Sequence, residues 1–225
     1  TEEELFTFIK DDIEDALELF PSTAFETGRC HWSKAATYAL KADVYLWTAR
    51  RKNGGDTDFR AALTACEEVQ KIAGIRLLPA YENKGNDEIL MAVSYKVNEA
   101  DNNYFDMMHI SPATISPDIE PEILATIGAG GGLMEQSPSD YLRAQYVPED
   151  SRRDVTFLEI YKNKDGQRMY YGTMAMKGRG TVVSGVRYFV DDIILYRYAD
   201  VLLMKAEAKN GLKEDPTDET KEVRE

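Results

Sequence analysis

The hydrophobic residues near the start of the chain follow a helical pattern. They recur at three- and four-residue steps from Leu5 to Phe20, which places them on one face of a helix. Pro21 follows directly, and proline cannot continue a helix because it lacks a backbone N–H and clashes with the preceding turn. The pattern therefore predicts an amphipathic helix that ends before Pro21.

Two further segments predict a helical hairpin. Ser33 is placed to cap a helix whose apolar positions end with Trp47, and we assign that tryptophan to the core. The glycine-bearing loop KNGGDTD interrupts the pattern, and apolar positions at helical spacing resume at Phe59 and continue to Ile72. Gly74 is expected to end this third helix. The second and third helices then form the hairpin.

Small residues mark one face of a helix predicted in the segment RYADVLLMKAEAKN. Ala199, Leu202, Leu203 and Ala206 share this face, and half of it is methyl-sized. Small side chains let a neighbouring backbone come close, as in stacked hairpins of the tetratricopeptide type. Gly211 is expected to close the helix in the left-handed conformation. This segment should therefore begin another helical hairpin.

The pattern changes between the helical parts. EILMAVSYK and VTFLEIYK alternate as strands do, and the proline- and glycine-bearing segments SPATISPDIEPE and IGAGGGLMEQSP separate them. Long ordered loops usually hold function. We therefore expect a mostly α fold, in which tetratricopeptide-like helical hairpins flank an inserted irregular loop and short-strand region. The expected boundaries are 1–78 and 196–225 for the helical scaffold and 79–195 for the ligand-facing region.

Composition and charge exclude several classes of protein. Asp and Glu total 40 against 27 Lys and Arg, giving a formal net charge of −13 at pH 7, so the average field repels nucleic acid. No run reaches the roughly 18 apolar residues of a membrane span, and the first residues lack the pattern of a signal peptide. Cys30 and Cys66 have no metal-site spacing, and Cys66 fits a core position. We predict no metal and no cofactor.

Motifs for catalysis are weak. GAGGGL lacks the Gly-Lys-Ser/Thr ending of a phosphate loop and the third glycine of a dinucleotide site. Neither a GxSxG elbow nor an HExxH helix accompanies the two histidines. Glu120 with Glu122, or Asp191 with Asp192, would serve as a glycosidase pair only at a productive separation. We interpret these acids as solvated side chains.

The segment NEADNNYFDMMH offers a candidate ligand site. Tyr104 and Phe105 supply flat apolar rings, and Asn102 and Asn103 supply amide groups beside them, a combination that fits polyhydroxylated ligands. The rings would equally well close a hairpin. RMYYGTM holds two adjacent tyrosines that point to opposite faces of a strand, so only one can serve, and we include Tyr171 as the alternative platform.

Five segments, in order along nearly all 225 residues, resemble the SusD/RagB family of outer-membrane glycan-binding lipoproteins. GRCHWSKAATYALKADVYLWTA is similar to the family's helix after a Gly-Arg turn, DFRAALTACEEVQKIAGIRLLPAYEN to its partner helix, and NDEILMAVSY to its strand. SPSDYLRAQYVPEDSRRDVTF resembles the family's segment in which an aspartate and arginines precede a short strand. ILYRYADVLLMKAEAKN resembles the family's most recognisable helix. The order of these segments carries the resemblance.

The resemblance implies a non-catalytic lipoprotein on the outward face of the outer membrane of a Gram-negative bacterium. Such a protein binds oligosaccharides or polysaccharides and passes them to a TonB-dependent SusC-like transporter. The ligand surface is expected in the irregular middle region, and no ligand-contacting residue is transferred because these differ among members. Family members are longer and carry a lipid anchor, so we expect an internal or truncated portion that associates with the membrane only through an anchor absent from this chain.

Two other functions stay open at this point. A tetratricopeptide-type scaffold would bind protein segments in a concave groove lined by helices. A glycoside hydrolase would need two facing carboxylates in a cleft. A glycan-binding protein would instead expose loop aromatics on one surface.

Overall fold

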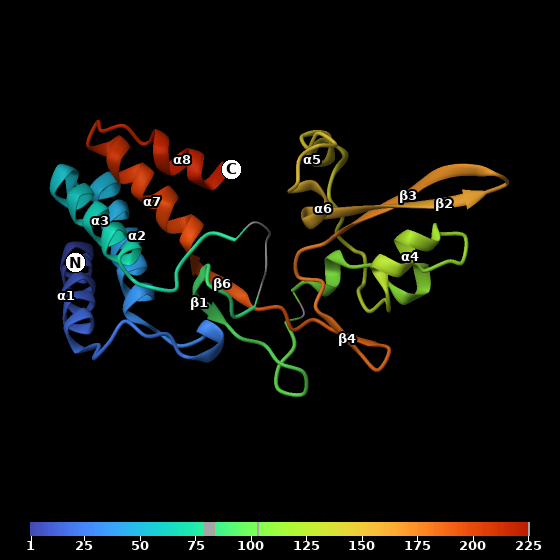
Figure 1. Cartoon of the computed structure of the whole chain (residues 1–225), viewed down its shortest axis with the longest axis horizontal. Helices are drawn as coiled ribbons and strands as arrows, with labels where there is room; N and C mark the ends of the chain where they lie inside the picture. Colours follow the sequence, from blue (N-terminus) through green and yellow to red (C-terminus); the bar gives the residue numbers. More distant parts are fainter. Residues whose placement is uncertain (79–83, 103, 225) are drawn as a thin grey trace. The chain divides into compact units, whose positions relative to one another are not determined.

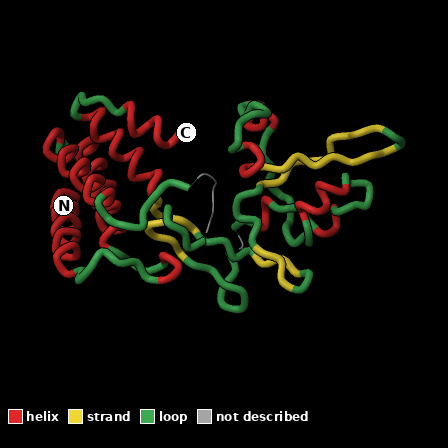
Figure 2. Tube along the Cα trace, in the orientation of Figure 1, coloured by secondary structure: helices red, strands yellow, loops and turns green. Residues whose placement is uncertain are grey.

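The computed structural model describes residues 1–78, 84–102 and 104–224 (Figure 1). Helices occupy the two ends of the chain, whereas long loops, short helices and paired strands occupy its middle (Figure 2). The expected mostly α fold, with tetratricopeptide-like hairpins and an inserted irregular region, is confirmed.

The chain forms two compact units. Unit 1 combines Thr1–Val93 with Ile193–Glu225, and unit 2 is the continuous segment Ser94–Asp192 between them. Strands β1 (Ile89–Val93) and β6 (Ile193–Arg197) pair antiparallel within unit 1. Unit 2 is therefore an insertion between two neighbouring strands of the helical unit. The boundaries expected for the ligand-facing region, at 79 and 195, stay a prediction.

Unit 1 is built from two helical hairpins and a leading helix. The first hairpin pairs α2 with α3, the second pairs α7 with α8, α1 packs on α2, and α3 packs on α7 (Figure 1). A short 3₁₀ turn, Thr27–Arg29, precedes α2, which Ser33 caps as expected because its hydroxyl accepts from Ala36 N. The helices span the following residues: α1 Glu2–Leu19, α2 Lys34–Arg51, α3 Gly55–Gln70, α7 Tyr198–Gly211 and α8 Thr217–Arg224.

Small residues lie where the helices of unit 1 meet. Ala39 and Ala42 of α2 are fully buried in a cluster with Cys66 of α3 and Val201 of α7. On α7, the predicted small-residue face is confirmed at its alanines and Leu202, which are buried. Helices α3 and α7 also come close at Gly211, where an added Cβ would lie 2.5 Å from the Phe59 ring. The α3–α7 contact therefore depends on side chains that are small or absent.

Four expectations for unit 1 were wrong. Trp47 is 54% exposed and Leu203 is 48% exposed, because α2 and α7 carry apolar residues on more faces than their neighbours cover. Gly211 lies inside α7 rather than beyond it, and Lys213 adopts the positive φ instead. Helix α3 ends at Gln70, before Gly74, although Gly74 does adopt a positive φ.

Unit 2 holds short elements around a separate apolar cluster. Strands β2 and β3 form an antiparallel hairpin, and β4 and β5 form a smaller one. Ile110, Ile119, Ile127, Ile160 and Met174 are buried together beneath these elements. The elements span the following residues: 3₁₀ turns Asp106–Met108 and Pro112–Thr114, α4 Pro121–Ile127, α5 Asp140–Ala144, α6 Arg153–Thr156, β2 Phe157–Lys164, β3 Gln167–Ala175, β4 Thr181–Val183 and β5 Val186–Tyr188.

The two expected strands exist with different details. Within VTFLEIYK, α6 takes the residues before Phe157 and β2 begins there. In β1, every residue from Ile89 to Ala92 is buried, so this strand is covered on both faces and does not alternate as the sequence suggested. Tyr95 lies beyond its end.

Candidate functional site

The glycine-rich segment Gly128–Gly132 packs against another stretch of backbone in unit 2. A Cβ on Gly132 would lie 2.2 Å from His109 O, and one on Gly130 would lie 2.9 Å from Pro112 Cα. Gly132 N donates to Ile110 O at 3.1 Å, which holds the two backbones together. The glycines therefore allow close packing of two loops, which explains GAGGGL without a phosphate ligand.

Arg187 of β5 joins the glycine-rich segment to the rest of unit 2. Its guanidinium donates to the backbone oxygens of Ile127, Ala129 and Arg179, with Nε 2.8 Å from Ala129 O. Burial, and to a lesser extent the charge of Arg179, lower the pKa of Arg187. The arginine thus acts as a clamp between three loop segments.

The turn at Asn102 presents the lead aromatic candidate. Asn102 is buried, its N donates to Phe189 O at 2.6 Å, and its Oδ1 accepts from Tyr104 N at 3.3 Å. Tyr104 is 62% exposed, and its ring meets the edge of Phe105 with centroids 5.4 Å apart. Asn103 lies outside the described residues. The buried Asn102 therefore accepts the backbone N–H of Tyr104, whose side chain is exposed.

Phe105 is held more deeply than Tyr104. The Phe105 ring leaves no room for a side chain at Gly178, where a Cβ would lie 2.2 Å from the ring. Gly180 is similarly close to the backbone of Tyr188, 2.0 Å from its oxygen. The glycines of KGRG thus let this loop pack closely against Phe105 at Gly178 and against the backbone of Tyr188 at Gly180.

The rings of RMYYGTM already have partners. Lys162 Nζ lies 3.3 Å from the centroid of the Tyr171 ring, and the Tyr171 hydroxyl donates to Thr114 O at 3.2 Å. Tyr170 has the Arg143 guanidinium 4.6 Å from its centroid. A cation lies over each ring, which reduces the apolar face that either tyrosine offers to a sugar.

The structure keeps the two candidate platforms on different segments. Tyr104 contacts Asn102 and Phe105, whereas Tyr171 contacts Lys162 and Thr114. No ring contact or hydrogen bond joins Tyr104 to Tyr171 in the part of the chain that the structure describes. They are therefore two separate platforms.

One exposed ring escaped the sequence reasoning. Tyr141 of α5 is 77% exposed, and the side chain of Asp140 beside it is 93% exposed. Gln145 donates its side-chain amide to Tyr141 O at 3.4 Å, so polar groups flank this ring as well. The signal was present in SPSDYLRAQY, where a tyrosine stands among polar residues next to the Ser139 cap.

A charged network supports the base of α5 and α6. Glu159 of β2 accepts hydrogen bonds from Arg143, Arg153 and the Tyr161 hydroxyl. Burial alone would raise the pKa of Glu159, but these hydrogen bonds and the nearby charge of Arg153 lower it below its ordinary value. The carboxylate is therefore a structural counter-ion for two arginines.

The acids that might have formed a hydrolase pair are engaged in structure. Glu120 accepts from Arg168 Nε at 2.7 Å. Asp191 accepts from Gly180 N at 3.0 Å, and Asp192 accepts from Tyr95 N at 3.1 Å. The expectation that Asp191 and Asp192 are solvated was wrong, since both are buried and bind backbone N–H groups.

His109 is another buried titratable group of unit 2. Its side chain is 1% exposed, it meets Phe189 edge to face at 5.9 Å, and neither ring nitrogen has a hydrogen-bond partner among the described residues. Burial, followed by the charge of Arg187, lowers the pKa of His109 to about 4. The imidazole is therefore neutral at pH 7 and packs as an aromatic core side chain.

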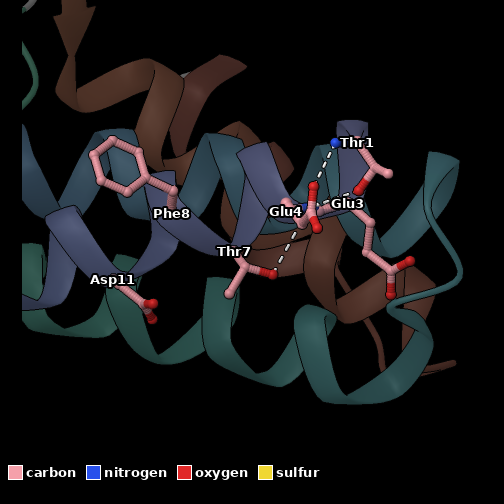
Figure 3. Close-up of a pocket in the computed structure, with 6 residues that line it drawn as sticks. All are labelled: Thr1, Glu3, Glu4, Thr7, Phe8 and Asp11. Atoms are coloured by element: carbon pink, nitrogen blue, oxygen red, sulfur yellow. Dashed lines mark hydrogen bonds and ion pairs between the residues drawn. The ribbon is translucent and has the colours of Figure 1, made fainter.

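A shallow depression on the surface of α1 is lined mainly by polar groups. Its lining residues are Thr1, Glu3, Glu4, Thr7, Phe8 and Asp11 (Figure 3). All of these residues belong to one helix and its cap, and the dashed contacts run within that helix (Figure 3).

Within residues 1–78, 84–102 and 104–224, His, Cys, Asp and Glu side chains form no group suited to a metal ion.

The hydropathy of the helices bears on membrane insertion. Over the described ranges, every helix is too short or too polar to cross a bilayer.

Stacked helical hairpins, interrupted by an irregular unit that carries exposed aromatic rings, define a tetratricopeptide-like protein with an inserted second unit. The SusD family model matches residues 51–225, and the chain belongs to this family. Comparison with curated proteins gives no match.

Solved structures of the family are similar over nearly the whole chain. A SusD superfamily protein from Bacteroides vulgatus is 30% identical with a TM-score of 0.82, covering 96% of this chain and 49% of its own. B. fragilis NanU is 31% identical with a TM-score of 0.77, covering 96% and 48%. A structure with a xylogluco-oligosaccharide is 22% identical with a TM-score of 0.66, covering 99% and 50%, and supports the fold alone. The chain spans about half the length of these proteins.

Proposed function

We propose that this chain is part of a surface glycan-binding protein that captures oligosaccharides and hands them to a TonB-dependent outer-membrane transporter. The observation that carries the proposal is the exposed ring of Tyr104 on the inserted unit of a member of the SusD family. Sugar rings present apolar C–H faces edged by hydroxyls, so a flat ring with polar groups nearby suits them.

The contacts of the turn support its use as a platform. Asn102 Oδ1 accepts a hydrogen bond from Tyr104 N, and the Phe105 ring contacts the Tyr104 ring edge to face. Contacts that restrict a ring before a ligand arrives reduce the entropy cost of binding.

The proposed protein has no catalytic role. Its candidate acids, Glu120, Asp191 and Asp192, are bound to an arginine or to backbone N–H groups, which leaves them poorly placed to exchange protons with a substrate. We expect incubation with polysaccharides to release no reducing ends. Release that disappears in Glu120→Ala would establish the hydrolase function instead.

Calorimetric titration of an oligosaccharide panel tests the site. Binding at an open surface should be weak, and a millimolar constant corresponds to only about −4 kcal/mol, so Tyr104→Ala should remove most of the signal. Tyr171→Ala and Tyr141→Ala are matched controls, because each removes an exposed tyrosine elsewhere in unit 2. Unchanged affinity in Tyr104→Ala with loss in either control would move the site to that ring.

The transporter, the lipid anchor and the outward-facing outer-membrane location belong to the same proposal. They rest on family membership. Affinity purification of the full-length protein from its native envelope should recover a TonB-dependent transporter in stoichiometric amount. Recovery of the protein alone under mild detergent would count against that partnership without affecting the glycan-binding test.

A further inference from the structure

A long stretch of unit 2 carries basic residues without acidic ones. Between Asp165 and Asp191 the sequence has four basic residues and no Asp or Glu. The basic residues are Arg168, Lys177, Arg179 and Arg187. The whole chain, in contrast, has a formal net charge of −13 at pH 7. This stretch is therefore a local source of positive potential in an acidic protein.

The arginines of this stretch differ in what their guanidinium groups bind. Arg168 Nε lies 2.7 Å from Glu120 Oε1, so this cation has a carboxylate partner. Arg187 is half-buried and donates to three backbone oxygens. Arg179 is exposed, and its guanidinium forms no ion pair or hydrogen bond with any residue that the structure describes. Arg179 therefore offers its N–H donors to solvent or to a ligand.

The backbone of Arg179 lies next to the ring pair of the candidate glycan site. A Cβ on the preceding Gly178 would lie 2.2 Å from the Phe105 ring, which in turn meets the Tyr104 ring with centroids 5.4 Å apart. The following Gly180 is equally close to its surroundings, since a Cβ there would lie 2.0 Å from a backbone oxygen. Consecutive Cα atoms are about 3.8 Å apart, so the exposed side chain of Arg179 starts one residue from the contact with Phe105.

Two neighbouring groups respond to the charge of Arg179. After burial, this charge is the next cause that lowers the pKa of Arg187, and it also lowers the pKa of His109, where burial and the charge of Arg187 come first. Asp191 opposes the effect at Arg187, but its carboxylate is buried and accepts from a backbone N–H group. Both charges that act on His109 are cations. A negative charge beside Arg179 would thus be stabilised.

We propose that the Tyr104 site binds oligosaccharides that carry a carboxylate, with the Arg179 guanidinium holding the carboxylate while a sugar ring stacks on Tyr104. This inference rests on the proposed glycan-binding function. The planar fork of an arginine matches the two oxygens of a carboxylate, and such charge-assisted pairs are stronger than neutral hydrogen bonds. Asp101 and Asp106 flank the turn in sequence, and neither forms an ion pair with Arg179 in the described part of the chain.

Calorimetry of the full chain with matched pairs of ligands tests the ligand class. Each pair is a uronic-acid oligosaccharide, such as oligogalacturonate, and its methyl ester, which has the same skeleton without the charge. At low ionic strength an acid should bind about tenfold more tightly than its ester, and added salt should narrow the difference because it screens the charges.

The outcomes separate this inference from the proposed function. If esters or other neutral oligosaccharides bind as tightly as the acids or more tightly, the carboxylate inference is overturned and the glycan-binding function stands. If neither acidic nor neutral oligosaccharides bind, both are overturned. Tyr104→Ala should abolish the binding of acid and ester alike, because the stacking ring is lost for both.

Substitution of the arginine tests its role. Arg179→Gln should weaken binding of the acid by about tenfold and leave binding of the ester unchanged, because only the charged pair is lost. Arg152→Gln is the matched control, since it removes the same charge from an arginine of unit 2 whose side chain is 77% exposed. Circular dichroism confirms that each variant is folded. Wild-type affinity for the acid in Arg179→Gln, or an equal loss in Arg152→Gln, would overturn the proposal.

Discussion

Replacing the buried His109 by phenylalanine should remove most of the pH dependence of stability between pH 7 and pH 5. The histidine packs on Phe189 with both ring nitrogens unpartnered among the described residues, so a phenyl ring can take its place without losing a hydrogen bond seen in the structure. A charged imidazole at this position would be desolvated and would face the cation of Arg187.

The sign of the effect follows from proton binding. The pKa of His109 is lowered from 6.5 to about 4 in the folded protein, so between these values the unfolded chain binds more protons than the folded one. Stability therefore falls as the pH falls through this window. Between pH 7 and pH 5 the loss is about 2 kcal/mol in the free energy of unfolding, taking 1.36 kcal/mol for each pKa unit at full titration.

Urea unfolding at pH 7 and pH 5 measures this loss. Far-UV circular dichroism follows both units, whereas tryptophan fluorescence follows only unit 1, because Trp32 and Trp47 both lie there. The lower limit of pH 5 avoids the range in which most carboxylates titrate. His109→Phe should be as stable as the wild type or more stable at pH 7, and should lose about 2 kcal/mol less on acidification.

His31→Phe is the matched control, because it makes the same change at an exposed position in unit 1. His109→Phe should lose less stability between pH 7 and pH 5 than this control does. If His109→Phe keeps the full pH dependence of the wild type, the argument from burial of an uncharged imidazole is wrong.

Two further substitutions probe close packing. Gly211→Ala should destabilise unit 1, because the new Cβ would lie 2.5 Å from the Phe59 ring. In a helix this change usually stabilises by about 1 kcal/mol, so the expected effect has the opposite sign. Asn210→Ala, an exposed position one residue earlier, should not destabilise unit 1 in parallel thermal melts. Arg187→Lys should lower the free energy of unfolding by about 2 kcal/mol or more, because one ammonium group cannot replace the guanidinium that donates to three backbone oxygens. Hydrogen exchange should become faster in the glycine-rich segment Gly128–Gly132 and stay unchanged in unit 1.

Helix periodicity predicted most of unit 1 because the pattern there reflects a single covered face. It failed at Trp47, since α2 carries apolar residues on several faces and only the neighbouring helices decide which are covered. Gly211 was misplaced for a related reason, because its role depends on a ring from α3 that no local signal reveals. Local patterns therefore predict elements better than they predict which faces meet.

The candidate site depended even more on long-range contacts. Sequence could select Tyr104 as a ring among amides, but the burial of Asn102 beneath it follows from contacts with Phe189, far along the chain. The cations over Tyr170 and Tyr171 likewise come from other segments. Whether a tyrosine is exposed or covered thus depends on contacts between distant segments, which the spacing of residues along the sequence does not reveal.

The pairing of Val93 with Ile193 has a consequence for how the chain folds and diverges. The backbone leaves the helical unit and returns to it at one rung of a two-stranded ladder, so the inserted unit has adjacent ends. Joining those strands across an unfolded loop of roughly a hundred residues would cost about 4 kcal/mol of chain entropy, whereas prior folding of the insertion brings the ends together. The inserted unit should therefore fold before the two strands pair, rather than after. Because its two ends are adjacent, its loops can change in length or sequence without moving the strands of the helical unit.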